Sequence, residues 1–564
     1  MAGGALFLNV ISTHHFTLGY PDGTTVLPFV CDFLSLFFGD GYKEYLSLNS
    51  YFWDLILPIL TFMLLLAFII CVYILVVRAA NKSIESGEQS GLESALGKVN
   101  DKLFVVLIFF VAIASICYLY VAEVPLNSDA NATYYGFKTT METGKLANWF
   151  LENPQNIGLY YIWSILYLFL GEQCIMGYYV LNIIAATFAY IMLYKITKQL
   201  FKPEKVRTIS LIVMFFSYCP IMRTTWAYSD LLFYVLTLCV VFYTIKLCEK
   251  FAVKDLIKLL VFAFLDSVVK YNALIIFIAC ALIILGKAVQ TAVKDKNIKV
   301  AKLFALPVCA FLIASMGAGG VMELTRNTMS YETEDIFVHS PQGEFVIYDA
   351  PMDYKYRKGD VNMRLTGHYW WSYSDAVTER EVELYGNAPV TPETRKEYNA
   401  RHQEIINNDF KEMIFDYITN PGSLITNIAA KSLILWNDPT NKMLTEYYML
   451  YNEQSDEYKE AQSEIRKALH TEPPIFVLEY IMGAAKKLTL LFALLYLAIN
   501  RKKLTLVQVL PALVFIGGVL FQTLFFAGNA RYLIPYEFVL VPYAAAGIMM
   551  FADMLLVSPH RSSG

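Results

Sequence analysis

Long apolar stretches separated by short polar segments recur along most of this 564-residue chain. Several reach or exceed the roughly 20 residues that a helix needs to cross the hydrocarbon core of a bilayer. The pattern predicts spans at 52–77, 103–122, 175–194, 208–222, 231–247, 300–321, 475–499, 504–526 and 532–554, with two shorter apolar halves around Lys270-Tyr271-Asn272. We therefore expect an all-α polytopic membrane protein of about 11 spans.

Three further stretches are too short or too polar to span. Residues 158–171 are apolar but supply only about a dozen apolar residues, fewer than the roughly 20 that a span needs, and we expect a short helix that dips into the outer leaflet. Alternatively, a neighbouring segment is the one that fails to cross. Residues 78–102 are rich in Ser, Glu and Lys without an apolar face, which predicts a loop. The patch at 26–38, broken by Pro28 and Asp32, is expected to lie on the membrane or against the bundle.

Between 323 and 470 the chain becomes polar, which predicts an extracytoplasmic insert of α or α+β structure. Within it, 410–436 has a helical pattern interrupted by Asn420-Pro421-Gly422. We expect the chain to begin with an extracytoplasmic or interfacial leader at 1–50, followed by an N-terminal membrane domain at 51–322 with an external loop at 123–157. The insert at 323–470 and C-terminal spans at 471–564 would follow.

Composition supports the membrane assignment. The chain is 57% hydrophobic and 17% charged, with a mean hydropathy of +0.46, whereas soluble domains carry roughly 25% charged residues. A formal net charge of −4 and the lack of a basic arm argue against nucleic acid as a partner. The nine cysteines show no CxxC or Cys/His spacing, so neither a disulfide framework nor a zinc site is expected.

Lysine and arginine clusters set the orientation, because cytoplasmic loops are enriched in them. Such clusters occur at 78–102, 195–207, 246–258, 287–302 and 501–503. If all of them are cytoplasmic, the loop after the second span is outside. That loop carries Asp129, in what the sequence predicts to be the first turn of a short surface helix.

Asp129 is the candidate catalytic residue. Its carboxylate could act as a general base that takes the proton of an acceptor hydroxyl, and it also suits a divalent cation such as Mg²⁺ or Mn²⁺. The alternative is a helix cap or dipole partner, with Ser128 or Asn127 as the actual cap.

Polar residues at the ends of other segments fall on the same predicted face, where ionisable groups beside apolar spans usually line a cavity or meet a partner. Arg531, Arg223 and Lys270 are candidates for holding a phosphate, and Asp230, Asn272 and Tyr532 for binding the rest of a substrate; Asn529 also lies on this face. Each has a plainer alternative. Arg531 suits a snorkelling interfacial arginine, Arg223 a structural pair with Asp230, Asp230 a helix cap, and Lys270 a neutralising pair with Asp266 on one helix face.

Motifs of soluble nucleotide and hydrolytic enzymes are absent: the sequence has no P-loop, no GxGxxG after a strand, no HExxH and no GxSxG. Three other motifs carry a resemblance. They are Ser128-Asp129-Ala130-Asn131, the Pro-containing 153–159 segment before a short apolar helix that ends in Gly171, and Arg531-Tyr532-Leu533-Ile534-Pro535. With Lys431–Trp436, they resemble GT-C type integral-membrane glycosyltransferases, especially bacterial members of the protein O-mannosyltransferase group (family 39).

The resemblance covers roughly residues 103–555. It implies transfer of a hexose from a polyprenyl-phosphate donor, with inversion at C1, at the outer face of a bacterial cytoplasmic membrane. By position, it implies Asp129 as the catalytic acidic residue and Arg531 as a contact of the donor phosphate. The chain departs from the family at Ala130, where many relatives carry a second acidic residue, and in its extra span at 52–77.

Two functions of other classes remain alternatives. A transporter or lipid flippase for an anionic lipid-linked substrate would line its path with the same charges, but it is expected to show broken helices related by internal symmetry, and no pseudo-repeat is visible in the sequence. A non-catalytic assembly or polymer-binding protein would tolerate loss of both Asp129 and Arg531. The acceptor, whether glycan, lipid or protein, does not follow from the sequence.

Overall fold

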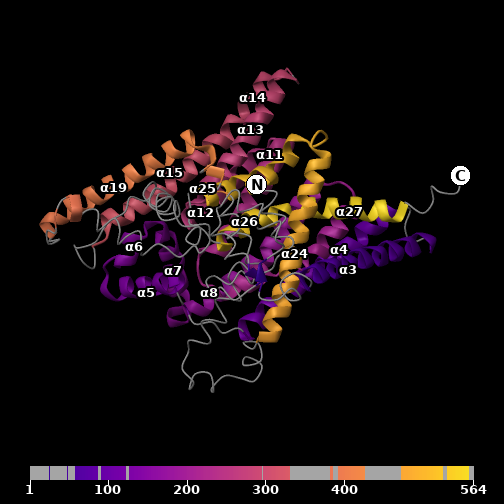
Figure 1. The fold of residues 1–564 in the computed structure, drawn as a ribbon, viewed down its shortest axis with the longest axis horizontal. Helices are drawn as coiled ribbons and strands as arrows, with labels where there is room; N and C mark the ends of the chain where they lie inside the picture. The colour runs from indigo at the N-terminus through magenta and orange to yellow at the C-terminus, as the bar shows by residue number, and fades with distance from the viewer. Residues whose placement is uncertain are drawn as a thin grey trace.

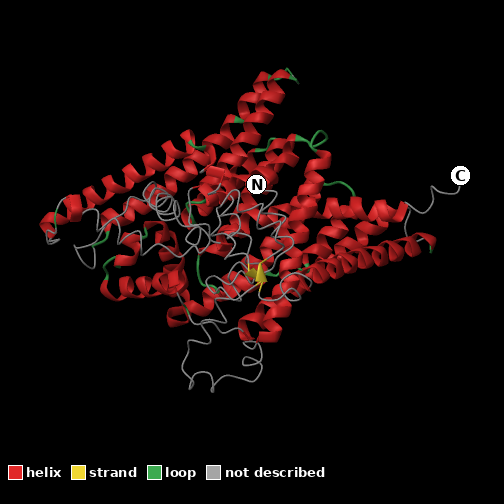
Figure 2. Cartoon of the chain, viewed as in Figure 1, coloured by secondary structure: helices red, strands yellow, loops and turns green. Residues whose placement is uncertain are grey.

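A computed structural model describes residues 24–25, 47–48, 57–86, 91–121, 126, 128–294, 296–330, 382–384, 386, 392–422, 424–425, 428, 472–524 and 530–557. Almost all regular structure in these ranges is helical (Figure 2). The exception is an antiparallel pair of two-residue strands, β1 (Thr24–Thr25) and β2 (Ser47–Leu48). The prediction of an all-α polytopic membrane protein is confirmed at this level. The leader at 1–50 otherwise lies outside the described residues.

Among the described residues, eleven helices form the bundle (Figure 1). They are α3 (Leu57–Glu85), α4 (Leu92–Val121), α8 (Cys174–Leu200), α9 (Glu204–Met214), α11 (Ser229–Glu249), α12 (Val253–Val269), α13 (Ala273–Val293), α15 (Ala305–Thr328), α24 (Glu472–Asn500), α25 (Leu506–Leu524) and α27 (Val541–Val557). Within the described ranges, ten helical segments are long and apolar enough to cross a bilayer.

Shorter elements connect the long helices. On the side of the predicted external loop they are α5 (Ser128–Thr143), α6 (Asn148–Glu152), η3 (Pro154–Asn156), α7 (Ile157–Leu170) and η4 (Gly171–Gln173). Elsewhere they are α10 (Cys219–Met222), η5 (Arg223–Thr225), α14 (Ile298–Leu303), η6 (Ala530–Leu533), α26 (Ile534–Glu537) and η7 (Phe538–Leu540).

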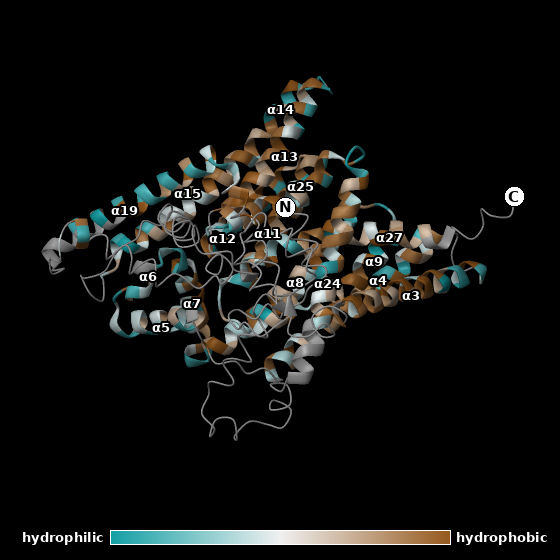
Figure 3. Ribbon diagram, in the orientation of Figure 1, coloured by the Kyte–Doolittle hydropathy of each residue, from teal (hydrophilic) through white to brown (hydrophobic). Residues whose placement is uncertain are grey.

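The core of the bundle lies around α11 and α27, whose spans are mostly buried, whereas α3 and α4 bury only about a fifth of theirs. The outer helices expose apolar side chains such as Leu64 (69%), Phe109 (64%) and Met316 (75%). Soluble monomers rarely expose extended apolar surface. The brown outer faces in Figure 3 therefore fit a bundle surrounded by lipid.

The predicted loop at 78–102 is wrong. Helix α3 continues to Glu85 and α4 already begins at Leu92. The two helix ends bury Ala80 and Leu96 against each other. Only the tertiary structure supplies the partner surface for this short apolar contact, so no apolar face is visible in the sequence.

The apolar segments around Lys270 form a full-length and a shorter helix rather than two halves. Helix α13 has 21 residues and is long enough to span. Helix α12 has 17 residues and is therefore about 25 Å long, somewhat less than the roughly 30 Å hydrocarbon core. This difference accounts for ten spanning segments where about 11 were predicted.

The prediction of a short helix at 158–171 is confirmed by α7, which has 14 residues. Gly171 has φ +56° and turns the chain into α8. At the other end, a Cβ on Gly158 would lie 1.9 Å from the Val268 carbonyl oxygen, so only glycine allows α7 to approach α12 this closely. Leu168 and Phe169 are nearly 80% exposed, in agreement with a helix end immersed in lipid; its depth in the leaflet stays a prediction.

The α5–α7 group lies at the lower left of Figure 1, away from the basic α3–α4 turn at the right and the α13–α14 turn at the top.

In the polar segment after 323, α15 first continues to Thr328. Farther on, α19 (Pro392–Thr419) begins well before the predicted 410 and ends at the predicted break, Asn420-Pro421-Gly422. A residue before proline is driven out of the helical region, which explains the break.

Candidate functional site

Three charged side chains from three chain segments meet at the N-terminal end of α11. The Lys270 ammonium lies 2.7 Å from one carboxylate oxygen of Asp230, and the Arg223 guanidinium lies 3.4 Å from the other. The side chains of Lys270, Asp230 and Arg223 are 15%, 6% and 1% exposed, respectively. Two cations share one carboxylate, so these three groups carry a net positive charge in a largely buried position.

The break between α12 and α13 directs Lys270 into this cluster. Helix α12 ends at Val269, and Lys270 has extended backbone angles (φ −159°, ψ 130°). The alternative that Asp266 pairs with Lys270 is therefore wrong, because that pairing needs a continuous helix between the two residues. Asp266 instead accepts a hydrogen bond from Thr237 at 3.4 Å, while Lys270 donates to Asp230. The predicted Arg223–Asp230 pair is confirmed.

Arg223 lies where the segment that includes α9 and α10 loses regular helical structure. Residues 223–225 form the 3-10 turn η5, and the carbonyl groups of Thr224 and Trp226 accept hydrogen bonds from the Asn182 amide of α8, at 3.2 and 2.9 Å. Buried backbone carbonyl groups need such partners. Asn182 thus holds the irregular segment that presents Arg223.

Aromatic rings surround the cations. The Lys270 ammonium lies 4.7 Å from the centroid of the Tyr532 ring, within the range of a cation–π interaction, and farther out it faces Tyr228. The Tyr228 hydroxyl donates to the side-chain oxygen of Asn156 in η3 at 2.9 Å. The fold therefore brings together Arg223, Asp230, Lys270 and Tyr532, which the sequence placed only at one membrane face.

Asp129 lies in the first turn of α5, as predicted, and is half-buried. The Thr133 hydroxyl donates to the Asp129 carbonyl at 2.6 Å and accepts from the Trp149 indole at 3.0 Å, which ties the start of α5 to α6. Through Tyr134 and Phe137, α5 also packs on Trp163 of α7, whose ring stacks on Tyr178 of α8 at 4.4 Å. These contacts fix the helix that carries Asp129 on the bundle.

The remaining candidates lie close to the cluster in sequence. Asn272 follows Lys270 by two residues, precedes α13 and is half-buried; its carbonyl accepts a hydrogen bond from the Ile275 amide at 3.2 Å. Arg531 belongs to η6, directly before Tyr532, but its side chain lies outside the described residues, as does Asn529.

The described residues contain no group of three or more His, Cys, Asp or Glu side chains that could hold a metal ion.

Sequence reasoning missed two residues that shape this site, Asn182 and Asn156. Asn182 was recognisable as an amide inside the predicted span at 175–194, since polar groups within a span usually have a defined partner. The same rule would have found Lys486 and Glu537, which lie in other predicted spans and pair at 3.2 Å.

No protein-family model matches this chain, and no curated protein matches it. The family resemblance therefore stays a prediction from the sequence.

Proposed function

We propose that the protein is a membrane glycosyltransferase of the GT-C type that moves a hexose from a polyprenyl-phosphate donor to a hydroxyl acceptor. The observation that carries this proposal is the buried Arg223–Asp230–Lys270 cluster, with its net positive charge, at the end of α11. An isolated buried charge is costly in a membrane protein and commonly marks a substrate path. An anionic phosphate at the headgroup level would complement the excess cation.

Lys270 is the cation best suited to bind this phosphate. It is 15% exposed and makes its short contact with only one oxygen of Asp230, whereas Arg223 is 1% exposed. We assign to Arg223 the role of fixing Asp230, which in turn orients the Lys270 ammonium. Arg531, next to Tyr532 in η6, is the second candidate for the donor phosphate.

We assign the role of general base to Asp129. Its carboxylate takes the proton of the acceptor hydroxyl, and the oxygen attacks C1 of the hexose on the face opposite the phosphate. The C1–oxygen bond to the phosphate breaks, and polyprenyl phosphate leaves with the bonding electron pair. Lys270 and Arg531 stabilise the negative charge on this leaving group. Attack from the opposite face inverts the configuration at C1.

Tyr532, Asn272 and Asp230 are proposed to shape the donor site. The Tyr532 ring covers the Lys270 ammonium at 4.7 Å, and the half-buried Asn272 amide offers both donors and acceptors for sugar hydroxyls. With the basic turns in the cytoplasm, the site faces the outside of a bacterial cytoplasmic membrane. The acceptor is a cell-surface glycan, a lipid or a protein.

The test uses purified protein in lipid nanodiscs, a polyprenyl-phosphate hexose labelled in the sugar, and membrane extracts as the source of acceptor. The wild type is expected to move the label to an acceptor, and Asp129→Asn to lose transfer while still binding the donor. Glu142→Gln is the matched control, because Glu142 is an exposed carboxylate near the other end of α5.

Full transfer by Asp129→Asn at equal protein level would remove Asp129 from the mechanism. Movement of the labelled lipid across a vesicle membrane with the sugar still attached would instead establish a flippase. The two outcomes are separated by extracting the lipid and asking whether the label remains on the polyprenyl phosphate.

A further inference from the structure

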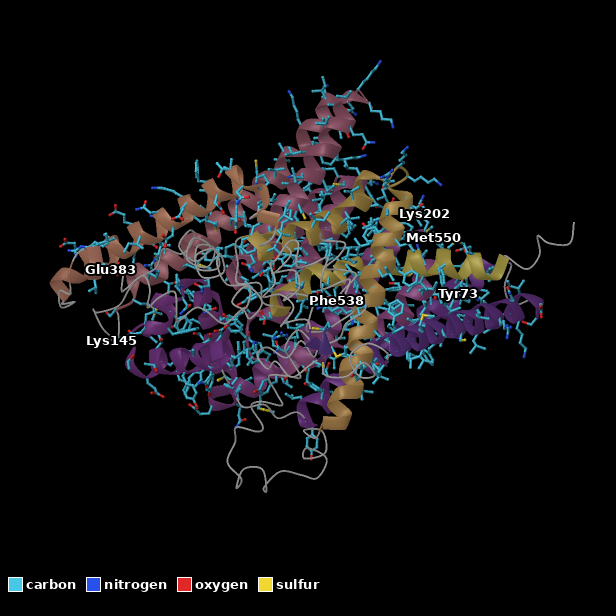
Figure 4. The ribbon with its side chains drawn as sticks, viewed as in Figure 1. Tyr73, Lys145, Lys202, Glu383, Phe538 and Met550 are labelled. Atoms are coloured by element: carbon cyan, nitrogen blue, oxygen red, sulfur yellow. The ribbon has the colours of Figure 1, made fainter. Side chains whose placement is uncertain are left out.

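A second polar position lies in the bundle, in a cavity between three segments. The cavity, which is partly open to its surroundings, is bordered by residues 216–219 at the α9–α10 junction, residues 482–490 of α24, and residues 537–541 of α26, η7 and α27. Phe538, one of its lining residues, is labelled beside α24 in Figure 4.

An ion pair lies in the wall of this cavity. The Lys486 ammonium is 3.2 Å from a carboxylate oxygen of Glu537, and each side chain is 11% exposed. Most of the remaining lining is apolar, with Met482, Phe538 and Leu540 among its members. Lys487 is the next residue of α24, and its side chain points about 100° around the helix axis from that of Lys486. The charged residues that line the cavity are therefore one cation, Lys486, and one anion, Glu537.

Two hydroxyl groups add acceptors to the cavity. Ser217 donates its proton to the Val213 carbonyl at 3.1 Å, and Thr489 donates to the Ala485 carbonyl at 2.8 Å. Because both protons are donated to backbone carbonyl groups, the oxygen lone pairs can accept from a ligand. With the Glu537 carboxylate, the lining therefore offers more acceptor than donor capacity, which favours a ligand with several N–H groups.

Two of the three segments place the cavity at a consistent depth. Lys486 precedes the end of its helix at the basic turn, Asn500, by 14 residues, and Cys219 follows the start of its segment, Glu204, by 15. At 1.5 Å per residue, these positions lie about 21–23 Å from the ends at the basic turns, and thus roughly 7–9 Å from the other side of a 30 Å hydrocarbon core. That depth corresponds to the boundary between lipid headgroups and acyl chains.

We propose that this cavity binds the head group of a zwitterionic phospholipid with a primary ammonium, the aminoethyl phosphate type. The phosphate lies against Lys486, and the ammonium donates to Glu537 and to the Ser217 or Thr489 oxygen. A simple anion would meet the Glu537 carboxylate and a simple cation the Lys486 ammonium, so only a head group with both charges complements the pair. The apolar lining takes the start of the acyl chains, which selects a lipid over free aminoethyl phosphate.

The test compares three lipids with matched acyl chains on the purified full-length protein, by native mass spectrometry after lipid exchange. Phosphatidylethanolamine is expected to bind about tenfold or more tightly than phosphatidylcholine, whose ammonium lacks N–H donors, and than anionic phosphatidylglycerol. Equal binding of the three lipids, or displacement of the bound lipid by stoichiometric free aminoethyl phosphate, would overturn the proposal.

Two variants locate the site. Glu537→Gln removes the negative charge that would attract the lipid ammonium and keeps the Lys486 cation in the wall, so the preference should shift to phosphatidylglycerol. Ala485→Phe fills part of the cavity without touching either charge and should lower binding of all three lipids. Asp255→Asn is the control, since it breaks the Lys246–Asp255 pair, also 3.2 Å apart, at the opposite end of α11; it should leave lipid preference unchanged.

An unchanged preference in Glu537→Gln together with unchanged binding in Ala485→Phe would exclude this cavity as the site. If Glu537→Gln fails to fold, the Ala485→Phe result decides alone. Both outcomes are independent of glycosyl transfer, which is measured separately on the same proteins.

Discussion

Replacement of Asp230 by asparagine is the most direct perturbation of the charged cluster. The substitution keeps the shape of the side chain but removes the negative charge that two cations share. Lys270 and Arg223, 15% and 1% exposed, then both lose the carboxylate that they contact. We expect a large loss of stability, because an uncompensated charge in a buried position must either be solvated by rearrangement or lose its proton.

The magnitude follows from the two distances. At 2.7 and 3.4 Å, and with an effective dielectric constant near 20, the two Coulomb attractions are each about 5–6 kcal/mol before the cost of desolvation is subtracted. Removing one partner of a buried pair typically costs about 3–5 kcal/mol, and we expect Asp230→Asn to lie in this range. Lys270→Met should cost less, about 1–3 kcal/mol, because Asp230 keeps Arg223 as its partner.

The assay is thermal unfolding of the purified protein in one detergent. The measured quantity is the fraction of protein that remains monodisperse after heating. Glu172→Gln serves as the control, since its pair with Lys138 has a similar distance, 2.6 Å, but an exposed carboxylate; exposed pairs contribute little. In the Asp230→Asn/Lys270→Met double variant, the second change should add little or even restore stability, because it removes one of the two buried cations that have lost the Asp230 carboxylate.

Two results would refute this reasoning. One is an Asp230→Asn variant as stable as the wild type, which would mean that the cluster is solvated and carries no buried charge. The other is strict additivity of the two single substitutions in the double variant, which would mean that Asp230 and Lys270 do not act on each other.

Three further variants test the site and its scaffold. Lys270→Met is expected to raise the KM for the polyprenyl-phosphate hexose about tenfold or more, since it removes a charge-assisted contact to phosphate; an unchanged KM in steady-state assays would place the phosphate elsewhere. Gly158→Ala should lower the free energy of unfolding by at least about 1–3 kcal/mol, because its Cβ would lie 1.9 Å from the Val268 carbonyl oxygen. Gly320→Ala is the control, since its Cβ would meet nothing within 4 Å. Equal melting temperatures of the two variants would contradict the α7–α12 contact. Asn182→Leu should cost about 1–3 kcal/mol by leaving two buried carbonyl groups without their donor, and a neutral effect on thermal unfolding would show that water replaces the amide.

Parts of the candidate site could be predicted from the sequence because they depend on local chain properties. Asp129 lies in the first turn of its helix, as the polar segment after the second span indicated. Arg223 and Asp230 are separated by only seven positions, so their pairing was a natural alternative before the fold was known. The partner of Lys270 was not predictable in this way: the helix ends one residue before it, and the nearest carboxylate in sequence, Asp266, bonds to Thr237 instead.

The sequence by itself determined that this chain is a helical membrane protein and where most of its spans lie. The physical reason is that a bilayer demands about 20 consecutive apolar residues with every backbone group bonded within the helix, and both conditions are local. The tertiary structure decided which polar groups meet. Lys270 reaches Asp230 across 40 positions, and Lys486 reaches Glu537 across 51. Such pairs depend on where helices break and how they pack, and a buried charge in low-dielectric surroundings takes whichever partner that packing supplies.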